Sequence, residues 1–154
     1  MSARRREPTI RTATASDAVQ LAAIARAAYA KYVPRMDREP PPMLADFPGF
    51  IAAGFVAVIE SGGEPAGYLI GWPEADAYLV DNIAIDPAWQ GQGLARKLMD
   101  HAIAETRRLN LPAVRLYTNV AMTENLVVYD RFGFVETYRA IENGLHRVHM
   151  RLTL

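Results

Sequence analysis

Residues 86–98 read DPAWQGQGLARKL, and they join the apolar run AYLVDNIAI at residues 77–85 to an amphipathic stretch. The glycines at positions 91 and 93 weaken the start of a helix, because glycine loses more conformational entropy on folding than any other residue. They also leave the backbone N–H groups of a helix N-terminus open to an anion. The spacing alone supports two interpretations, an anion-binding loop and a tight strand-to-helix turn.

Two common phosphate-binding motifs do not fit this segment. The Walker sequence is absent, because Lys97 is neither preceded by glycine nor followed by serine or threonine. The dinucleotide fingerprint requires glycine or alanine three residues after its second glycine, and Arg96 stands at that place. A nucleoside triphosphate loop and a Rossmann loop are therefore both excluded.

Composition narrows the class of protein further. The 154 residues, of which 51% are hydrophobic, suit one domain with a sizeable core. Lysine plus arginine and aspartate plus glutamate each number 17, so no general field favours nucleic acid or an acidic membrane. Cysteine is absent, which excludes thiolate nucleophiles and cysteine metal sites.

Targeting signals are not evident in the sequence. No apolar run approaches the roughly 20 residues that span a bilayer. The basic first residues lack the apolar stretch of a signal peptide. We expect a cytoplasmic protein without nucleic-acid or membrane partners, with a disordered tail at residues 1–8 and a single domain at residues 9–154.

Hydrophobic periodicity predicts the order of helices and strands. A first helix is expected from an N-cap at Thr14, with Asp17 in its first turn, to residues 31–33, before Pro34. The proline-rich segment 34–49 is expected to be irregular, with one short helix near residues 43–47. The predicted strands are residues 9–13, 55–60, 65–72, 77–85, 113–118, 134–141 and 145–154. Two further helices are predicted at residues 94–109 and 123–132. This order predicts an α/β fold whose mixed, mostly antiparallel β-sheet is flanked by helices.

Two separated signatures resemble those of the GNAT N-acetyltransferase superfamily. The first, Gln/Arg-x-x-Gly-x-Gly/Ala, is matched by Gln90, Gly93 and Ala95, after a strand whose ending at residues 83–87 is also similar. The second combines asparagine, tyrosine and Gly-Phe along one segment, and residues 125–134 match it. The predicted element order also matches the family, so the resemblance covers almost the whole chain.

The resemblance implies acetyl-coenzyme A as the cosubstrate. Backbone N–H groups of residues 91–95 would hold its pyrophosphate, and the strand edge at residues 83–85 would pair with the amides of its pantetheine arm. In the family, a backbone N–H of this strand also faces the thioester oxygen. The residues implied to bind the coenzyme are Ile83, Ala84, Ile85, Gln90, Gly91, Gln92, Gly93, Leu94, Ala95, Arg96, Asn125 and Tyr129.

Acetyl transfer to an amine calls for one group that protonates the leaving thiolate and another that accepts a proton from the amine. Asn125 and Tyr129 lie four apart on a predicted helix and share a face, and the resemblance makes Tyr129 the general acid. Periodicity alone is more typical of a packed core aromatic at this position. Asp81 is the candidate base, because the family often has an acidic residue near this point. The alternative for Asp81 is a carboxylate at a strand bulge or in a surface ion pair.

The sequence determines the acceptor pocket least. The resemblance implies a pocket built from the first two helices, the loop between them and the loop after the last crossover strand. The residues implied to line it are Tyr29, Tyr32, Met43, Asp46, Tyr117, Thr118, Asn119 and Met122. Arginines at positions 35 and 38 would favour a carboxylate, whereas the tyrosines and the aspartate would favour a cationic amine. The proline-rich segment is either a stiff connector or a direct contact.

The sequence therefore predicts an acyl-CoA-dependent N-acetyltransferase. It would move an acetyl group from acetyl-CoA to a primary amine by direct attack in a ternary complex. A small-molecule amine is the expected acceptor, because no charged groove is evident. The alternative is an acyl-CoA-binding sensor or partner-binding module without turnover, against which the joint presence of Asn125 and Tyr129 argues. No metal site is expected, and a homodimer is implied by the family resemblance alone.

Overall fold

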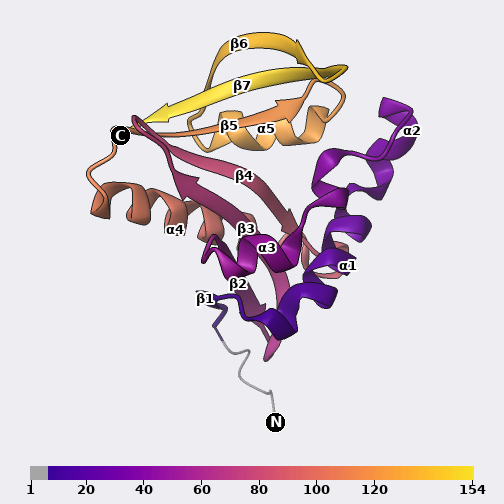
Figure 1. Ribbon diagram of the computed structural model, residues 1–154, viewed down its shortest axis with the longest axis vertical. Helices are drawn as coiled ribbons and strands as arrows, with labels where there is room; N and C mark the ends of the chain where they lie inside the picture. Colours follow the sequence, from indigo (N-terminus) through magenta and orange to yellow (C-terminus); the bar gives the residue numbers. More distant parts are fainter. Residues whose placement is uncertain (1–6) are drawn as a thin grey trace.

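Seven strands form one mixed sheet in the computed structural model, which describes residues 7–154. The strand order is β1-β2-β3-β4-β5-β7-β6, and β4 and β5 form a parallel pair, whereas the other neighbours are antiparallel (Figure 1). This arrangement confirms the mixed, mostly antiparallel α/β fold. The predicted tail falls largely on residues 1–6, outside the described residues, and residues 7 and 8 belong to no helix or strand.

The bounds of the elements follow the predicted order. The strands are β1 (Thr9–Thr12), β2 (Val56–Ser61), β3 (Glu64–Pro73), β4 (Tyr78–Ile85), β5 (Ala113–Asn119), β6 (Val135–Glu142) and β7 (Leu145–Thr153). The helices are α1 (Ala18–Tyr29), α2 (Val33–Met36), α3 (Phe47–Ala52), α4 (Leu94–Arg108) and α5 (Thr123–Arg131). Short 3-10 turns occupy Ala15–Asp17, Ala30–Tyr32, Pro41–Leu44 and Pro87–Trp89.

Two helical predictions were wrong. The chain remains helical through Pro34, because proline stands in the first turn of α2, where its missing N–H costs no hydrogen bond. The short helix expected near residues 43–47 begins instead at Phe47, with Pro48 in its first turn and Asp46 as its N-cap. Residues 41–44 form a separate 3-10 turn. In both cases proline starts a helix rather than ending one.

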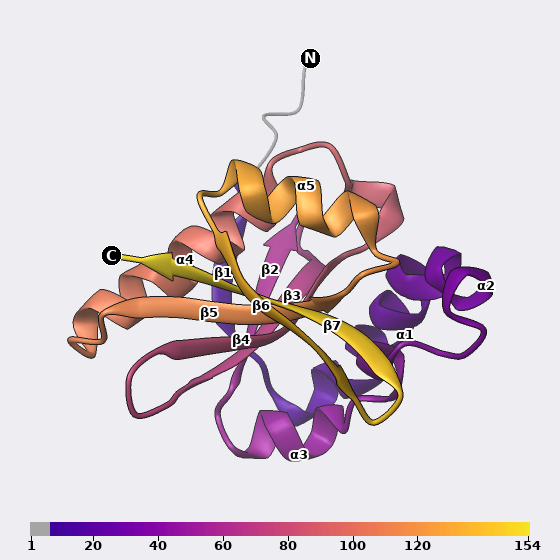
Figure 2. The ribbon, with the colours of Figure 1, turned by 90° about the horizontal axis from the view of Figure 1, so that it is seen from above.

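Helices cover both faces of the sheet (Figure 2). On one face, Leu98 of α4 and Tyr129 of α5 pack in a buried cluster with Val114 of β5. On the other face, Leu21 of α1 and Phe47 of α3 pack in a second cluster that includes residues of β2, β3 and β4. Each face of the central strands is therefore buried, which explains their nearly continuous apolar sequence.

The parallel pair β4–β5 opens partway along its length. Its pairing extends from Tyr78 and Val114 to Val80 and Leu116, although β4 continues to Ile85 and β5 to residue 119. Figure 1 shows the two strands diverging toward the side on which α1 lies. A parallel pair that separates leaves backbone hydrogen-bonding groups of β4 without a strand partner on that side.

The opening begins at a β-bulge. On the neighbouring strand, residue 70 pairs with Asn82 and residue 71 pairs with Val80, so Asp81 is the extra residue on β4. A bulge bends its strand and redirects a side chain. The bulge that the sequence analysis considered as a structural explanation for Asp81 is therefore present, and it lies at the edge of the opening.

Candidate active site

A first cavity, of about 570 Å³, lies between α1, the diverging end of β4, the start of α4 and α5. We call it the glycine-loop cavity. The predicted coenzyme-binding residues that line it are Ile83, Ala84, Ile85, Gln90, Gly91, Gly93, Leu94, Ala95, Arg96, Asn125 and Tyr129. Gln92 is not among the lining residues, and it is exposed. The structure thus brings eleven of the twelve predicted residues to one cavity.

The glycine loop leaves the start of α4 uncovered. Gly91 and Gly93 adopt left-handed conformations, with φ of 81° and 77°, and a Cβ built on either residue would meet no atom within 4 Å. Gly93 is also the N-cap of α4, so no side chain caps the first N–H groups of the helix. These N–H groups and the helix dipole fit an anionic group, because nothing in the loop blocks its approach.

A cationic side chain also lines this part of the cavity. Arg96 lies in the first turn of α4, 3.3 Å from Asp100, and its guanidinium stacks at 5.3 Å over the ring of Phe132. Both members of the ion pair are more than half exposed, so the pair contributes little to stability. The guanidinium therefore remains available to an anion at the helix start.

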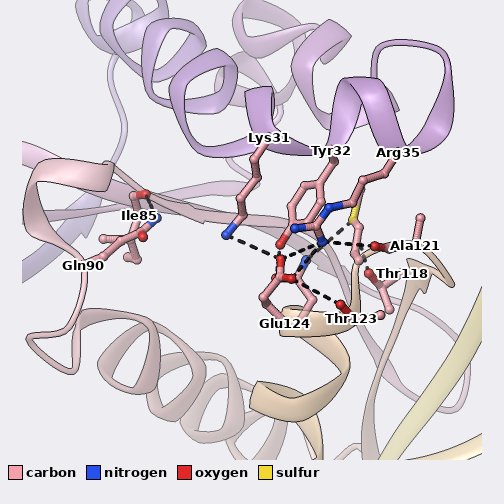
Figure 3. Close-up of polar contacts among 11 residues, drawn as sticks. Lys31, Tyr32, Arg35, Ile85, Gln90, Thr118, Ala121, Thr123 and Glu124 are labelled. Atoms are coloured by element: carbon pink, nitrogen blue, oxygen red, sulfur yellow. Dashed lines mark hydrogen bonds and ion pairs between the residues drawn. The ribbon is translucent and has the colours of Figure 1, made fainter.

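The free edge of β4 forms the floor of the cavity. The hydroxyl of Tyr29 donates to the carbonyl of Ile83 over 2.8 Å. Nε2 of Gln90 donates to the carbonyl of Ile85 over 3.2 Å (Figure 3). In an extended strand the N–H and C=O of one residue point the same way, so the N–H groups of these two isoleucines also face the opening. The edge can therefore receive an extended, amide-bearing ligand.

Helix α5 forms the opposite wall of the cavity. Asn125 and Tyr129 occupy the same face, as their spacing predicts, and the Tyr129 ring packs edge-on against Phe134 at 5.9 Å. The Tyr129 side chain is buried, and burial raises the pKa of its phenol well above the usual value. The phenol is therefore protonated at neutral pH and can act as a proton donor.

A second cavity, of about 310 Å³, adjoins the first, and we call it the aspartate cavity. Four residues line both cavities, namely Tyr29, Ile83, Asn125 and Tyr129. These residues come from α1, β4 and α5, so the two cavities meet where β4 and β5 diverge. If each cavity holds a ligand, the inner ends of the two ligands would meet beside Tyr129.

Asp81 faces the aspartate cavity beside Tyr117, whose hydroxyl donates to its Oδ1 over 3.0 Å. Burial raises the pKa of Asp81, and the hydrogen bond from Tyr117 and the charge of Arg147 oppose that rise. The guanidinium of Arg147 lies 4.4 Å above the Tyr117 ring and 3.7 Å from Glu142. The carboxylate is thus held in place by one neutral donor and one nearby cation.

The proline-rich segment forms the roof of the aspartate cavity. Pro41 and Pro42 line it, so the segment is part of the cavity wall as well as a connector. Nδ2 of Asn82 donates to the Pro42 carbonyl over 3.4 Å, and Oδ1 of Asn82 accepts from Tyr68 over 2.8 Å. This buried link ties the roof to β4. Asp46 also lines the cavity and caps α3 by accepting from the N–H of Gly49 over 3.1 Å.

The predicted acceptor residues divide between the two cavities. Tyr29, Asp46, Tyr117, Thr118, Asn119 and Met122 line the aspartate cavity. Tyr32 lines only the glycine-loop cavity, where its hydroxyl donates to Oδ1 of Asn125 over 3.4 Å. Met43 packs against the core cluster of α1 and α3 and lines neither cavity.

Several residues of the aspartate cavity were missed by sequence reasoning. They are Met36, Pro41, Pro42, Ala45, Phe50, Val80, Asn82, Leu145 and Arg147. Arg147 reaches the cavity because β7 pairs with β5, which aligns residue 147 with residue 119. Nothing in the local sequence around Arg147 signals this long-range pairing.

The two arginines considered for a substrate carboxylate have other partners. Arg35 contacts Glu124 at 2.7 Å, and Lys31 lies 3.6 Å from the same carboxylate, so these side chains link the start of α5 to the segment after α1 (Figure 3). The hydrogen bond from Arg35 lowers the pKa of Glu124 to about 2, which makes Glu124 a poor proton acceptor. Arg38 donates to the carbonyl of Asn143 over 3.4 Å.

Two further observations concern residues 7–154 only. Within this range, no group of three or more histidine, cysteine, aspartate or glutamate side chains is arranged to hold a metal ion. None of the helices described here has the length and apolarity needed to cross a bilayer.

Two cavities thus adjoin at the opening between β4 and β5, one with an open helix N-terminus and the other with carboxylates. The family model described as acetyltransferase (GNAT) domain matches residues 52–136, which is more than half of the chain. This protein belongs to the GNAT acetyltransferase family.

Relatives of known name share part of the chain. A [ribosomal protein bS18]-alanine N-acetyltransferase of Escherichia coli K12 is 31% identical over 74 residues, which cover 48% of this chain and 50% of that protein. A mycothiol acetyltransferase of Geodermatophilus obscurus is 33% identical over 93 residues, covering 46% of this chain and 29% of that protein. The chain thus spans half or less of the length of these curated relatives.

Solved structures share the fold over nearly the whole chain. The PaiA N-acetyltransferase of Thermoplasma acidophilum, solved in complex with coenzyme A, superposes with a TM-score of 0.81 at 12% identity. The match covers 97% of this chain and 100% of that one. At this identity the likeness shows the fold alone, and it also covers residues outside the range 52–136 that the family model matches.

Proposed function

We propose that this protein transfers an acetyl group from acetyl-CoA to a primary amine, with both substrates bound at once. The observation that carries the proposal is the meeting of the two cavities at Tyr29, Ile83, Asn125 and Tyr129. Such a meeting suits direct transfer, because two ligands can approach end to end without a covalent enzyme intermediate. The absence of cysteine from the chain fits the same route.

The glycine-loop cavity is the proposed coenzyme site. The uncapped N–H groups at the start of α4 and the guanidinium of Arg96 would hold the diphosphate. The free edge of β4 at Ile83 and Ile85 would pair with the amides of the pantetheine arm, as an added strand does. A neighbour of the same fold was solved with coenzyme A, which supports this ligand.

The coenzyme supplies an acetyl group that is activated as a thioester. Transfer forms a C–N bond to the amine and breaks the C–S bond of the thioester. An acceptor that arrives as an ammonium ion loses two protons, of which one ends on the thiol and one reaches solvent. The protein must therefore accept a proton from the amine, donate one to sulfur, and stabilise the oxyanion that forms between these steps.

Residues at the junction of the cavities supply these functions. The Tyr129 phenol, kept protonated by burial, is the proposed donor to the thiolate. Asp81 is the proposed acceptor of the amine proton, directly or through water, because its raised pKa makes it a stronger base than an ordinary carboxylate. A backbone N–H of β4 at the opening would stabilise the oxyanion.

The relatives favour an enzyme over a binding module. Both curated relatives are named acetyltransferases, although their names point to different acceptors. The acceptor of this protein must therefore be inferred from its own aspartate cavity. That cavity is of a size that holds a small molecule, which fits the expected small-molecule amine.

Release of free thiol from acetyl-CoA across a panel of amines tests the proposal. We expect amine-dependent release, with formation of the acetylated amine confirmed by mass spectrometry. When the concentration of one substrate is varied at several fixed concentrations of the other, the double-reciprocal plots should intersect, because a ternary complex forms. Binding of coenzyme A without release for any amine would favour a sensor, and parallel kinetic lines would contradict direct attack.

A further inference from the structure

The aspartate cavity carries charges that select among amines. Three charged side chains line it, namely Asp46, Asp81 and Arg147. The charge of Arg147 is partly offset by Glu142, which lies 3.7 Å away, and the guanidinium lies 4.4 Å from the centre of the Tyr117 ring. The two carboxylates that line the cavity therefore outweigh its one guanidinium, which makes the field negative.

The two carboxylates stand at different depths. Asp81 is half-buried, and its Oδ1 accepts the hydrogen bond from Tyr117. Asp46 is exposed, and one of its oxygens caps α3. We therefore take Asp46 as the carboxylate at the cavity mouth and Asp81 as the deeper one.

Most of the uncharged lining of the cavity is apolar or aromatic, and it includes Met36, Phe50, Val80, Met122 and Leu145. The uncharged polar side chains that line it are Asn82, Thr118, Asn119 and Asn125. The ring of Phe50 is held by stacking on Trp72 at 5.6 Å, and that of Tyr29 by its hydrogen bond to β4. Fixed aromatic rings and aliphatic side chains favour an apolar substituent, and aromatic faces also attract a cation.

We propose that the acceptor is a cationic primary amine with an apolar or aromatic remainder and no carboxylate, and that Asp46 excludes carboxylate-bearing amines. This inference rests on the proposed function, and it names the substrate class of the same site. A carboxylate on the acceptor would meet two like charges, and Arg147, the one cationic side chain that lines the cavity, already contacts Glu142.

Three acceptors that share one skeleton provide the test. They are 2-phenylethylamine, phenylalanine and phenylalanine amide, which differ only in bearing no substituent, a carboxylate or a neutral amide. We expect kcat/KM to be highest for 2-phenylethylamine and lowest for phenylalanine, with the amide between them. Equal or higher kcat/KM for phenylalanine would overturn the inference.

Asp46→Asn isolates the role of charge at the mouth. Asparagine caps helices as well as aspartate does, so α3 should keep its cap while the cavity loses one negative charge. We expect the ratio of kcat/KM for 2-phenylethylamine over phenylalanine to fall by about three- to tenfold, as for the loss of one partly solvated charge. Asp76→Asn, an exposed acid outside both cavities, is the matched control and should leave the ratio unchanged.

A binding measurement separates this inference from the proposed function. Calorimetric titration of the three acceptors into the protein saturated with coenzyme A should give the same order of affinity, whether or not turnover occurs. If no amine of any class gives thiol release, acetyl transfer is contradicted. The predicted order of binding affinities would still support the substrate class in that case. The inferred substrate class would be overturned if the acceptors bind in a different order. It would also be overturned if a diamine is preferred to 2-phenylethylamine, or if only long peptides are turned over.

Discussion

Tyr117 on β5 donates its hydroxyl hydrogen bond to Oδ1 of Asp81 on β4 across the point at which the two strands separate, over 3.0 Å. The bond crosses from one wall of the opening to the other. It orients the carboxylate, and it favours the charged form of Asp81, so it lowers the pKa that burial raises. The proposed base is therefore tuned by a residue of the neighbouring strand.

Removal of this hydrogen bond should change the pH dependence of the reaction. Asp81 must be ionised to accept a proton, so activity falls as pH drops through its pKa. In Tyr117→Phe the pKa of Asp81 should rise further, and the acidic limb of the kcat/KM profile should move to higher pH while the maximum rate at high pH is largely kept. Tyr138→Phe, an exposed tyrosine on β6, is the control. Superimposable acidic limbs for Tyr117→Phe and the wild type would remove Asp81 from the role of base.

Loss of the proposed acid should affect turnover more than binding. Tyr129→Phe keeps the buried ring and its packing against Phe134 but removes the proton that the thiolate would take. We expect kcat to fall by about 10²-fold or more, with the dissociation constant of coenzyme A nearly unchanged. Steady-state kinetics and calorimetry measure the two quantities. An unchanged kcat would show that solvent protonates the thiolate without this tyrosine.

A negative charge in the glycine loop should weaken coenzyme binding. Gly93→Glu places a carboxylate beside the open N–H groups of α4, where it would repel a diphosphate. We expect the affinity for coenzyme A to fall about tenfold or more. Gly63→Glu is a matched control, because Gly63 lies in the β2–β3 turn with φ of 83° and also has open space around its Cβ position. Both variants carry the same backbone strain, so equal affinity for coenzyme A in the two would argue against this loop as the diphosphate site.

The capping box before α1 should contribute a pH-dependent share of stability. Asp17 accepts from the Thr14 N–H over 2.7 Å and from Arg11 over 2.7 Å, and the hydrogen bond from Arg11 leads the effects that lower the pKa of Asp17 to about 2. Asp17→Ala should cost about 1–2 kcal/mol at pH 7. Because the pKa is lower in the folded state, this contribution is complete above about pH 4 and is lost as pH falls toward 2.

Urea unfolding of wild type and Asp17→Ala at several pH values measures that difference. The gap in the free energy of unfolding should narrow steadily below pH 4 and close near pH 2. A gap that stays constant over this range would mean that packing of the side chain, and not its charge, explains the loss.

Local patterns of the sequence predicted most of the fold. Alternation and apolar runs located the seven strands to within about two residues, and the glycine loop located the start of α4. The errors fall at prolines. Pro34 and Pro48 each stand in the first turn of a helix, and a proline in a helical pattern predicts a stop and a start equally well.

The glycine-loop cavity was more predictable than the aspartate cavity for a physical reason. Its residues come from the contiguous segments 83–96 and 125–132, together with part of α1, so short-range motifs identify them. The aspartate cavity combines residues from α1, the proline-rich roof, β4, β5 and β7. Arg147 and Asn82 reach it through strand register and a bulge, and neither feature leaves a local trace in the sequence.

A crystal structure of the protein with coenzyme A tests the central claim most directly. We predict that the diphosphate lies on the backbone N–H groups of residues 91–95, that the pantetheine arm runs along Ile83 and Ile85, and that the sulfur points to Tyr129 where the cavities meet. Coenzyme bound elsewhere, or an arm that lies outside the opening between β4 and β5, would contradict the account.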